Sequence, residues 1–287
     1  GRPHLMATLT VLSHIQVNAL FAARERGQSL VTESLDLGLT KVEIELSANY
    51  VLLPDNQRLD WAQLREIVDN KLSCYLVRDS QIEKIHFFSH LFSRYYSLMP
   101  TRRAPTMLIS GIPMHRIKDT EPYRDTLSKI RAVAPLNGRV LDTTMGLGYT
   151  AIEAANTATH VTTVELDPTV EKVCRHNPWS QGLFTNPRIF RLVGDTYDVI
   201  RQFADGEFTR IIHDPPMFSM AGELYSLDFY RQLVRVLRPA GRVFHYVGNP
   251  SSKSGRGVTR GVVHRLQEAG FRRVKPYAKA FGVVAYK

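Results

Sequence analysis

A glycine-rich loop in the second half of the chain has the spacing of a ligand-binding turn. Gly146 and Gly148 follow Asp142 at four and six residues, and Ala151 comes three residues after Gly148. This spacing fits the G-x-G-x-x-G/A turn that binds the pyrophosphate of dinucleotides, and Glu165 follows at a distance suited to a ribose. The glycine spacing by itself therefore leaves a nicotinamide or flavin enzyme open.

The acidic residues around this loop favour another ligand. A carboxylate at Asp142 would repel a pyrophosphate but could accept a hydrogen bond from an ammonium group. Glu165 could accept from two ribose hydroxyls, and Asp195 from an adenine amino group. S-adenosylmethionine carries an ammonium, a sulfonium and an adenosine, and it has no phosphate. We therefore predict that Asp142, Gly146, Gly148, Glu165 and Asp195 bind S-adenosylmethionine.

A second motif, Asp214-Pro215-Pro216, follows the fourth expected strand of the same region. The prolines fix the backbone and remove two N–H donors, which leaves carbonyls and the Asp214 carboxylate as acceptors for an amino group. Such acceptors can hold a nitrogen against a sulfonium methyl, where positioning contributes more than a strong base. Phe218 could stack on a base, and His213 directly precedes the motif. These five residues form the predicted catalytic set.

The chain is strongly basic, with a net charge of +10 and a pI near 9.7. Such a balance favours polyanionic partners, above all nucleic acid. Lys253, Arg256 and Arg260 lie in a stretch rich in glycine and serine after the fifth expected strand. We expect them to hold phosphates of the substrate, with a flexible solvated loop as the alternative.

The elements that must position these residues form an alternation of strands and helices from Arg139 onward, which predicts a parallel sheet. The expected strands span residues 139–143, 160–165, 188–193, 210–213 and 241–247, followed by a closing pair at 272–278 and 281–286. A helix is expected before the first strand, from Glu121 to Val133. The acidic residues then lie at the carboxyl ends of strands, where open α/β sheets bind their ligands.

The first half of the chain has a mixed pattern. Its expected elements are a helix over residues 9–26, strands at 41–47, 73–77 and 84–88, and a short helix that Asp60 caps. We predict a smaller α+β or β-rich module over residues 6–105, which could bind the substrate, and a second domain over 106–287. The five residues before Met6 look like a tag.

The motifs of the second half, in order, resemble those of class I S-adenosylmethionine-dependent methyltransferases. The resemblance rests on Val140–Gly148, Val164–Asp167 and Val193–Asp195, and it covers about half of the chain. It implies a Rossmann-like seven-stranded sheet whose last strand is antiparallel. Asp-Pro-Pro is similar to the motif of enzymes that methylate nitrogen in nucleic acids, although Met217 stands where an aromatic residue is typical.

The chain as a whole also resembles a family of predicted methyltransferases known from archaea. The residues that carry this resemblance are Leu98–Thr101, Ala104–Thr106, Ile109–Arg116 and the Asp-Pro-Pro stretch. It implies methyl transfer but names no substrate.

Three functions are compatible with these observations. The leading hypothesis is N-methylation of a nucleotide in RNA. A small-molecule transferase such as a polyamine aminopropyltransferase, using decarboxylated S-adenosylmethionine, could bind its amine through Asp214, Glu223 and Asp228, although the nearby cations would repel a polycation. A non-catalytic RNA-binding protein with a vestigial cofactor fold is the third.

Cysteine spacing and hydropathy argue against a metal-binding, disulfide-bonded or membrane-spanning protein. Cys74 and Cys174 stand a hundred residues apart without metal-type spacing, so we expect neither a metal site nor a disulfide. There is no apolar run of about 20 residues, as a membrane span needs, and no secretory signal. We therefore expect a cytoplasmic protein without membrane contact, and the oligomeric state stays open.

Overall fold

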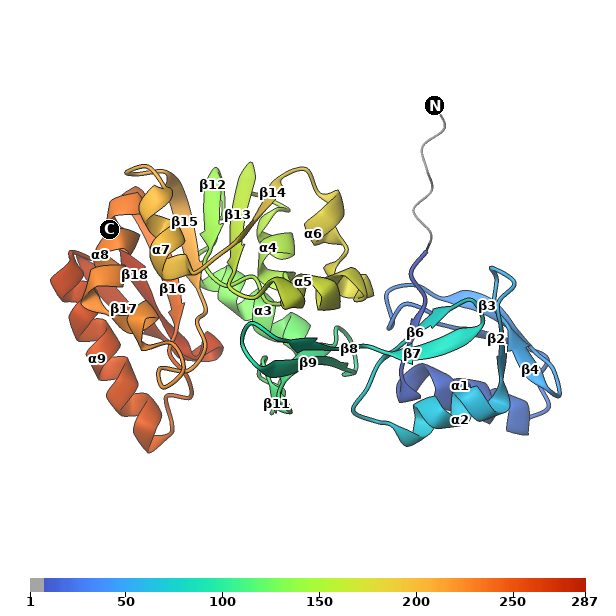
Figure 1. The fold of residues 1–287 in the computed structure, drawn as a ribbon. Helices are drawn as coiled ribbons and strands as arrows, with labels where there is room; N and C mark the ends of the chain where they lie inside the picture. The colour runs from blue at the N-terminus through green and yellow to red at the C-terminus, as the bar shows by residue number, and fades with distance from the viewer. Residues whose placement is uncertain (1–7) are drawn as a thin grey trace, which may run out of the picture. The chain divides into compact units, whose positions relative to one another are not determined.

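The computed structural model describes residues 8–287, and the chain divides into two compact units. Of the described residues, the first contains 8–123 together with 169–181, and the second contains 124–168 and 182–287. The predicted tag lies outside the described residues. Figure 1 shows the elements of both units.

The second unit is built on a seven-stranded sheet with strand order β14-β13-β12-β15-β16-β18-β17 (Figure 1). Its first five strands are parallel, and β18 runs antiparallel to both of its neighbours. The bounds are β12 (Arg139–Asp142), β13 (His160–Glu165), β14 (Ile189–Val193), β15 (Phe208–His213), β16 (Leu237–Tyr246), β17 (Arg273–Tyr277) and β18 (Gly282–Tyr286). This arrangement confirms the predicted Rossmann-like α/β fold.

The strand order reverses direction at β12, which lies between β13 and β15. Asp142, the last residue of β12, is in register with Thr163 on one side and Ile212 on the other. The carboxyl ends of these three central strands therefore meet at a topological switch point, the usual ligand site of an open α/β sheet. Strand β16 begins four residues before the predicted start, at Leu237, because an irregularity in register lets it pair with Phe208 of β15.

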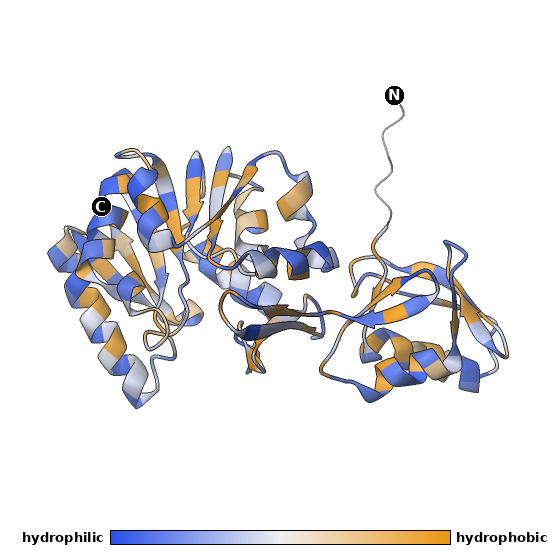
Figure 2. Cartoon of the chain, viewed as in Figure 1, coloured by the Kyte–Doolittle hydropathy of each residue, from blue (hydrophilic) through white to orange (hydrophobic). Residues whose placement is uncertain are grey.

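Helices pack on the sheet through apolar faces, and Figure 2 shows hydrophobic and hydrophilic residues side by side on them. One core joins Leu141, Ile211 and Val243 of the strands to Phe229 and Leu233 of a helix. The helices of this part are α3 (Pro122–Ala132), α4 (Tyr149–Ala154), α6 (Gly182–Thr185), α7 (Thr196–Val199), α8 (Leu227–Val236) and α9 (Lys253–Ala269). Short 3-10 turns follow at η2 (Ile200–Gln202), η3 (Gly222–Tyr225) and η4 (Ala278–Ala280).

The first unit is β-rich, as predicted for the N-terminal part, with three small antiparallel sheets. The strands are β1 (Val11–Leu12), β2 (Leu30–Glu33), β3 (Val42–Leu46), β4 (Tyr50–Leu52), β5 (Arg58–Asp60), β6 (Tyr75–Arg78), β7 (Gln81–Lys84), β8 (His86–Ser89), β9 (Arg94–Met99), β10 (Thr106–Ile109) and β11 (Ile112–Pro113). Its helices are α1 (His14–Glu25), α2 (Trp61–Asp69), most of α5 (Pro168–Arg175) and the turn η1 (Pro178–Ser180).

Local signals explain where the first helices begin. Ser13 and Asp60 cap α1 and α2, each with a glutamine three residues on that completes a capping box. Helix α1 therefore starts later than predicted, because Val11 and Leu12 pair with β6 instead. The predicted domain boundary, between residues 105 and 106, lies between the paired strands β9 and β10. The division into domains with separate roles stays a prediction.

No helix within residues 8–287 combines the length and the apolar character that a membrane span requires.

The core of the second unit gives a stability prediction. Phe229 lies on α8 and is fully buried in the core between this helix and the sheet, so Phe229→Ala leaves a cavity and should lower the unfolding free energy by about 3–5 kcal/mol. The matched control is Phe190→Ala, because Phe190 is 48% exposed on the edge strand β14 and should cost less than about 1 kcal/mol. Scanning calorimetry measures both. Equal losses for the two variants would contradict the assignment of this core.

Candidate active site

A buried carboxylate lies at the carboxyl end of β12, where the strand order reverses. Asp142 is 1% exposed, and its Oδ2 accepts a hydrogen bond of 2.8 Å from the hydroxyl of Thr163 on β13. Its Oδ1 is buried and has no hydrogen-bond partner among residues 8–287. A buried polar atom without a partner is costly, and such atoms mark positions where a ligand completes the hydrogen bonding.

The surroundings of Asp142 disfavour its negative charge. Burial raises the pKa of Asp142 to about 7, and the carboxylates of Asp214 and Glu165 add to this effect. The Thr163 hydroxyl and the Thr144 amide oppose the shift only in part. A cation bound beside Asp142 would reverse this balance, because it stabilises the ionised form.

The glycine loop lies against Glu165 at the end of β13. The amide of Gly146 donates to Oε2 at 3.0 Å, and the amide of Asp167 donates to Oε1 at 3.1 Å. Burial raises the pKa of Glu165 to about 7 despite these two hydrogen bonds. Each oxygen keeps a further lone pair, so the predicted role of Glu165 as an acceptor for ribose hydroxyls is compatible with its position.

Gly148 and Asp195 each have a structural role in addition to the predicted one. Gly148 has a φ of +83°, and a Cβ there would stand 2.4 Å from the side chain of Leu183, so the close approach of α6 requires glycine. Asp195 caps α7, accepting from the amide of Tyr197 at 2.9 Å. Their roles in binding a cofactor stay predictions.

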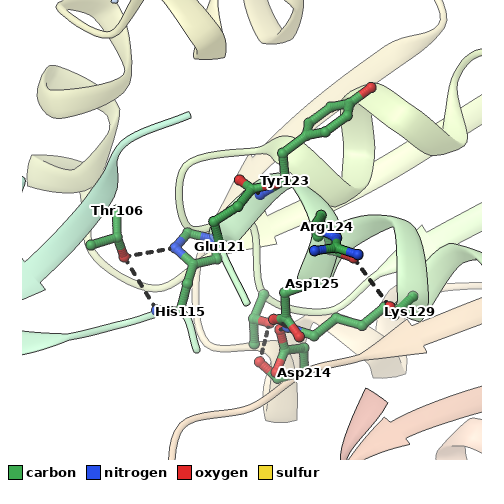
Figure 3. A network of polar contacts seen from close by, with 10 residues as sticks. Thr106, His115, Glu121, Tyr123, Arg124, Asp125, Lys129 and Asp214 are labelled. Atoms are coloured by element: carbon green, nitrogen blue, oxygen red, sulfur yellow. Dashed lines mark hydrogen bonds and ion pairs between the residues drawn. The ribbon is translucent and has the colours of Figure 1, made fainter. Parts of the chain in front are cut away.

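Asp214, directly after β15, belongs to a cluster of three charges (Figure 3). Its Oδ2 lies 2.5 Å from Nζ of Lys129, and the same Nζ lies 3.0 Å from Oδ2 of Asp125. Lys129 and Asp125 are almost completely buried, whereas the side chain of Asp214 is 29% exposed. Asp214 is thus the member of the cluster that a ligand can reach.

The rest of the Asp-Pro-Pro loop is held by hydrogen bonds to its carbonyls. The Thr144 hydroxyl donates to the carbonyl of Asp214 at 2.6 Å, and the Tyr225 hydroxyl donates to that of Pro216 at 2.8 Å. These bonds use carbonyls that were predicted to face the substrate. Phe218 is half exposed, with its ring edge-on to Tyr225 at 5.4 Å.

His213 lies in the protein interior, fully buried. Its Nε2 donates to the carbonyl of Leu224 at 2.8 Å, so its Nδ1 accepts from the hydroxyl of Thr143 at 2.7 Å. Burial lowers the pKa of His213 to about 4, which keeps the ring neutral. The predicted catalytic role would require His213 to break both hydrogen bonds; its observed position is that of a structural residue.

The predicted substrate-binding cations lie on a helix instead of a loop. Lys253, Arg256 and Arg260 are exposed on the N-terminal half of α9, which Ser252 caps. Of the acids considered for an amine, Asp228 is engaged with Arg201 and the hydroxyl of Tyr197.

Sequence reasoning missed four residues of this region: Thr163, Lys129, Asp125 and Tyr225. The spacing of Asp125 and Lys129 on the expected helix, four residues apart, was the one available signal. Within residues 8–287, no group of three or more His, Cys, Asp or Glu side chains could hold a metal ion.

Asp142 generates a prediction about stability and pH. Its pKa is higher in the folded chain than in the unfolded one, so the folded state binds more protons and loses stability as the pH rises from about 4 to about 7. Asp142→Asn removes this loss. We expect the variant to be more stable than the wild type at pH 8, on the order of 2 kcal/mol, with the difference shrinking towards pH 4.

Denaturant unfolding at several pH values measures this difference. The control is Glu45→Gln, which removes an exposed carboxylate on β3 instead of a buried one. A variant Asp142→Asn that is less stable than the wild type at pH 8 would show that the carboxylate is not strained by its burial.

Comparison with known proteins finds a domain family that is similar to part of the second unit. Residues 145–281 match the spermine/spermidine synthase domain. A polyamine aminopropyltransferase of Sulfolobus acidocaldarius is 31% identical over 96 residues, which is 32% of each chain. The crystal structure of spermidine synthase from Thermotoga maritima covers 70% of both chains with a TM-score of 0.56 and 17% identity, which shows a shared fold.

These findings correct the predicted family, activity and partner. The matched domain family is that of the spermine and spermidine synthases, so the predicted methyltransferase family and RNA N-methylation were wrong, as was RNA as the partner. The predicted roles of Phe218 in stacking on a base and of the three cations of α9 in holding phosphates assumed an RNA substrate, so they lose that basis. The chain is an enzyme of the fold shared by S-adenosylmethionine-dependent transferases.

One relative matches almost the whole chain. The uncharacterized protein MJ1233 of Methanocaldococcus jannaschii is 44% identical over 260 residues, which cover 88% of both chains. The chain belongs to the same family as this archaeal protein.

Proposed function

We propose that this enzyme transfers an aminopropyl group from decarboxylated S-adenosylmethionine to an amine. The observation that carries the proposal is the buried carboxylate of Asp142, whose Oδ1 has no hydrogen-bond partner among residues 8–287. The match of residues 145–281 to the spermine/spermidine synthase domain supports it, because that segment contains Glu165 and Asp214.

The charge of the site favours the decarboxylated donor over S-adenosylmethionine itself. After burial, the carboxylates of Asp214 and Glu165 are among the largest causes that raise the pKa of Asp142. The decarboxylated compound carries an ammonium and a sulfonium without a carboxylate, so it brings two positive charges to this acidic site. S-adenosylmethionine would bring its own carboxylate as well, which the same acids would repel. Asp142 is the proposed acceptor for the ammonium, and Glu165 for the ribose.

Asp214 is the residue proposed to bind the acceptor amine. Its Oδ1 makes no hydrogen bond within the described residues and its side chain is partly exposed. The amine nitrogen attacks the aminopropyl carbon next to sulfur, so that an N–C bond forms and the C–S bond breaks. The electron pair of that bond goes to sulfur, which leaves as the neutral thioether 5′-methylthioadenosine. The surplus proton on nitrogen passes to the Asp214 carboxylate and then to water.

The sequence analysis counted the three cations of α9 against a polyamine substrate, because they would repel a polycation. Lys253, Arg256 and Arg260 are exposed to solvent, where charges are well screened. They are not among the largest causes of the shifted pKa values of Asp142, Glu165 and Lys129. The cytoplasmic location expected from the sequence stays a prediction.

The proposal predicts turnover with the decarboxylated donor. Incubation with a diamine or spermidine should release 5′-methylthioadenosine, measured by liquid chromatography, whereas S-adenosylmethionine should transfer no methyl group. Asp214→Asn should lower kcat by about 10²–10³-fold, because the amide cannot take the proton. Asp205→Asn, an exposed acid paired with Arg235, is the matched control and should retain full activity. Transfer from S-adenosylmethionine alone, or an active Asp214→Asn variant, would overturn the proposal.

A further inference from the structure

A buried lysine contacts the proposed amine-binding carboxylate, and the motifs of the sequence do not account for it. Lys129, on α3, has a side chain that is 5% exposed, and its Nζ lies 2.5 Å from Oδ2 of Asp214, across 85 residues of sequence. The same Nζ lies 5.2 Å from the centre of the Tyr246 ring at the end of β16. The lysine thus joins α3 to the ends of two sheet strands.

Lys129 is charged in this environment. Burial by itself would lower the pKa of Lys129, but the nearby carboxylates of Asp214 and Asp125 outweigh it and raise the pKa above its ordinary value. Ion pairs of this kind stabilise little, because desolvation offsets their attraction, and apolar residues of similar volume often replace them without loss. Stability alone is therefore a weak explanation for the triad of Asp125, Lys129 and Asp214.

The two carboxylate oxygens of Asp214 differ in their contacts. Lys129 binds Oδ2, and Oδ1 makes no hydrogen bond within the described residues. The Thr144 hydroxyl fixes the backbone of the same residue through its carbonyl. Asp214 is thus held at its backbone and at one carboxylate oxygen, and the other carboxylate oxygen is left for a ligand.

Asp125 contacts Lys129 from the same helix. It lies one helical turn before Lys129, and its Oδ2 is 3.0 Å from Nζ. The ammonium of Lys129 is therefore held from two sides, by Asp125 on α3 and by Asp214 after β15.

From this geometry we infer that Lys129 is a positioning residue, which orients Asp214 towards the acceptor amine, and that Asp125 holds the ammonium of Lys129 in place. The inference rests on the proposed function. During transfer Lys129 retains its proton, and the proton lost by the amine nitrogen goes to the free oxygen of Asp214.

Kinetics of four variants test these roles with a diamine as the acceptor. Lys129→Met should lower kcat about 10²-fold and leave the KM for the decarboxylated donor within about twofold, because the donor binds at Asp142 and Glu165. Lys129→Arg keeps the charge and should recover most of the lost activity. Asp125→Asn loses one of the two ionic contacts of Nζ but leaves that with Asp214, so it should lower kcat less than Lys129→Met does.

The fourth variant separates positioning from folding. Lys129→Met removes the cation that both carboxylates contact, so it destabilises the protein as well. Lys129→Met/Asp125→Asn also removes one of these carboxylates and should restore the midpoint of thermal unfolding but not kcat.

The outcomes distinguish the two proposals. Wild-type kcat in the double variant, or a Lys129→Met protein with full activity, would overturn the positioning role alone. A wild-type protein that turns over no amine with the decarboxylated donor would overturn the aminopropyl transfer and this inference together.

Discussion

The site depends on several carboxylates gathered at the carboxyl end of one sheet, with little positive charge among them. Asp142 is buried, Glu165 is half-buried, and burial raises the pKa of both to about 7. Lys129 offsets part of this charge but is already shared between two acids. Keeping such groups ionised without a cation costs stability. A ligand that brings positive charge relieves this cost, and the decarboxylated donor and an amine both do so.

The fold explains how acids far apart in the sequence come to one place. Strand β12 lies between β13 and β15, so the ends of these three strands place Asp142, Glu165 and Asp214 at neighbouring points of the sheet edge. The loop after β12 is held to both neighbours, through Met145 to Val164 and through Thr144 to Asp214. The same contacts that form the switch point therefore also bring the carboxylates within reach of one another.

The strands of the second unit and its acidic motifs could be predicted from the sequence, because periodicity and strand-end residues are local signals. The ion pair of Lys129 with Asp214 could not, since it joins residues that only the folded sheet brings together. His213 looked catalytic because of its place in the sequence, but its ring lies inside the core. The RNA prediction failed for a different reason. A net charge of +10 describes the whole chain, whereas Asp142, Glu165 and Asp214 at the carboxyl ends of the central strands are acidic.

The central claim is that the acidic cluster binds a dication and becomes ionised when it does. Calorimetric titration of the decarboxylated donor at pH 7, in two buffers of different ionisation enthalpy, measures it most directly. Because the pKa values of Asp142 and Glu165 lie near 7, binding should release protons, and S-adenosylmethionine should bind more weakly. Binding without proton release, or tighter binding of S-adenosylmethionine, would contradict the account.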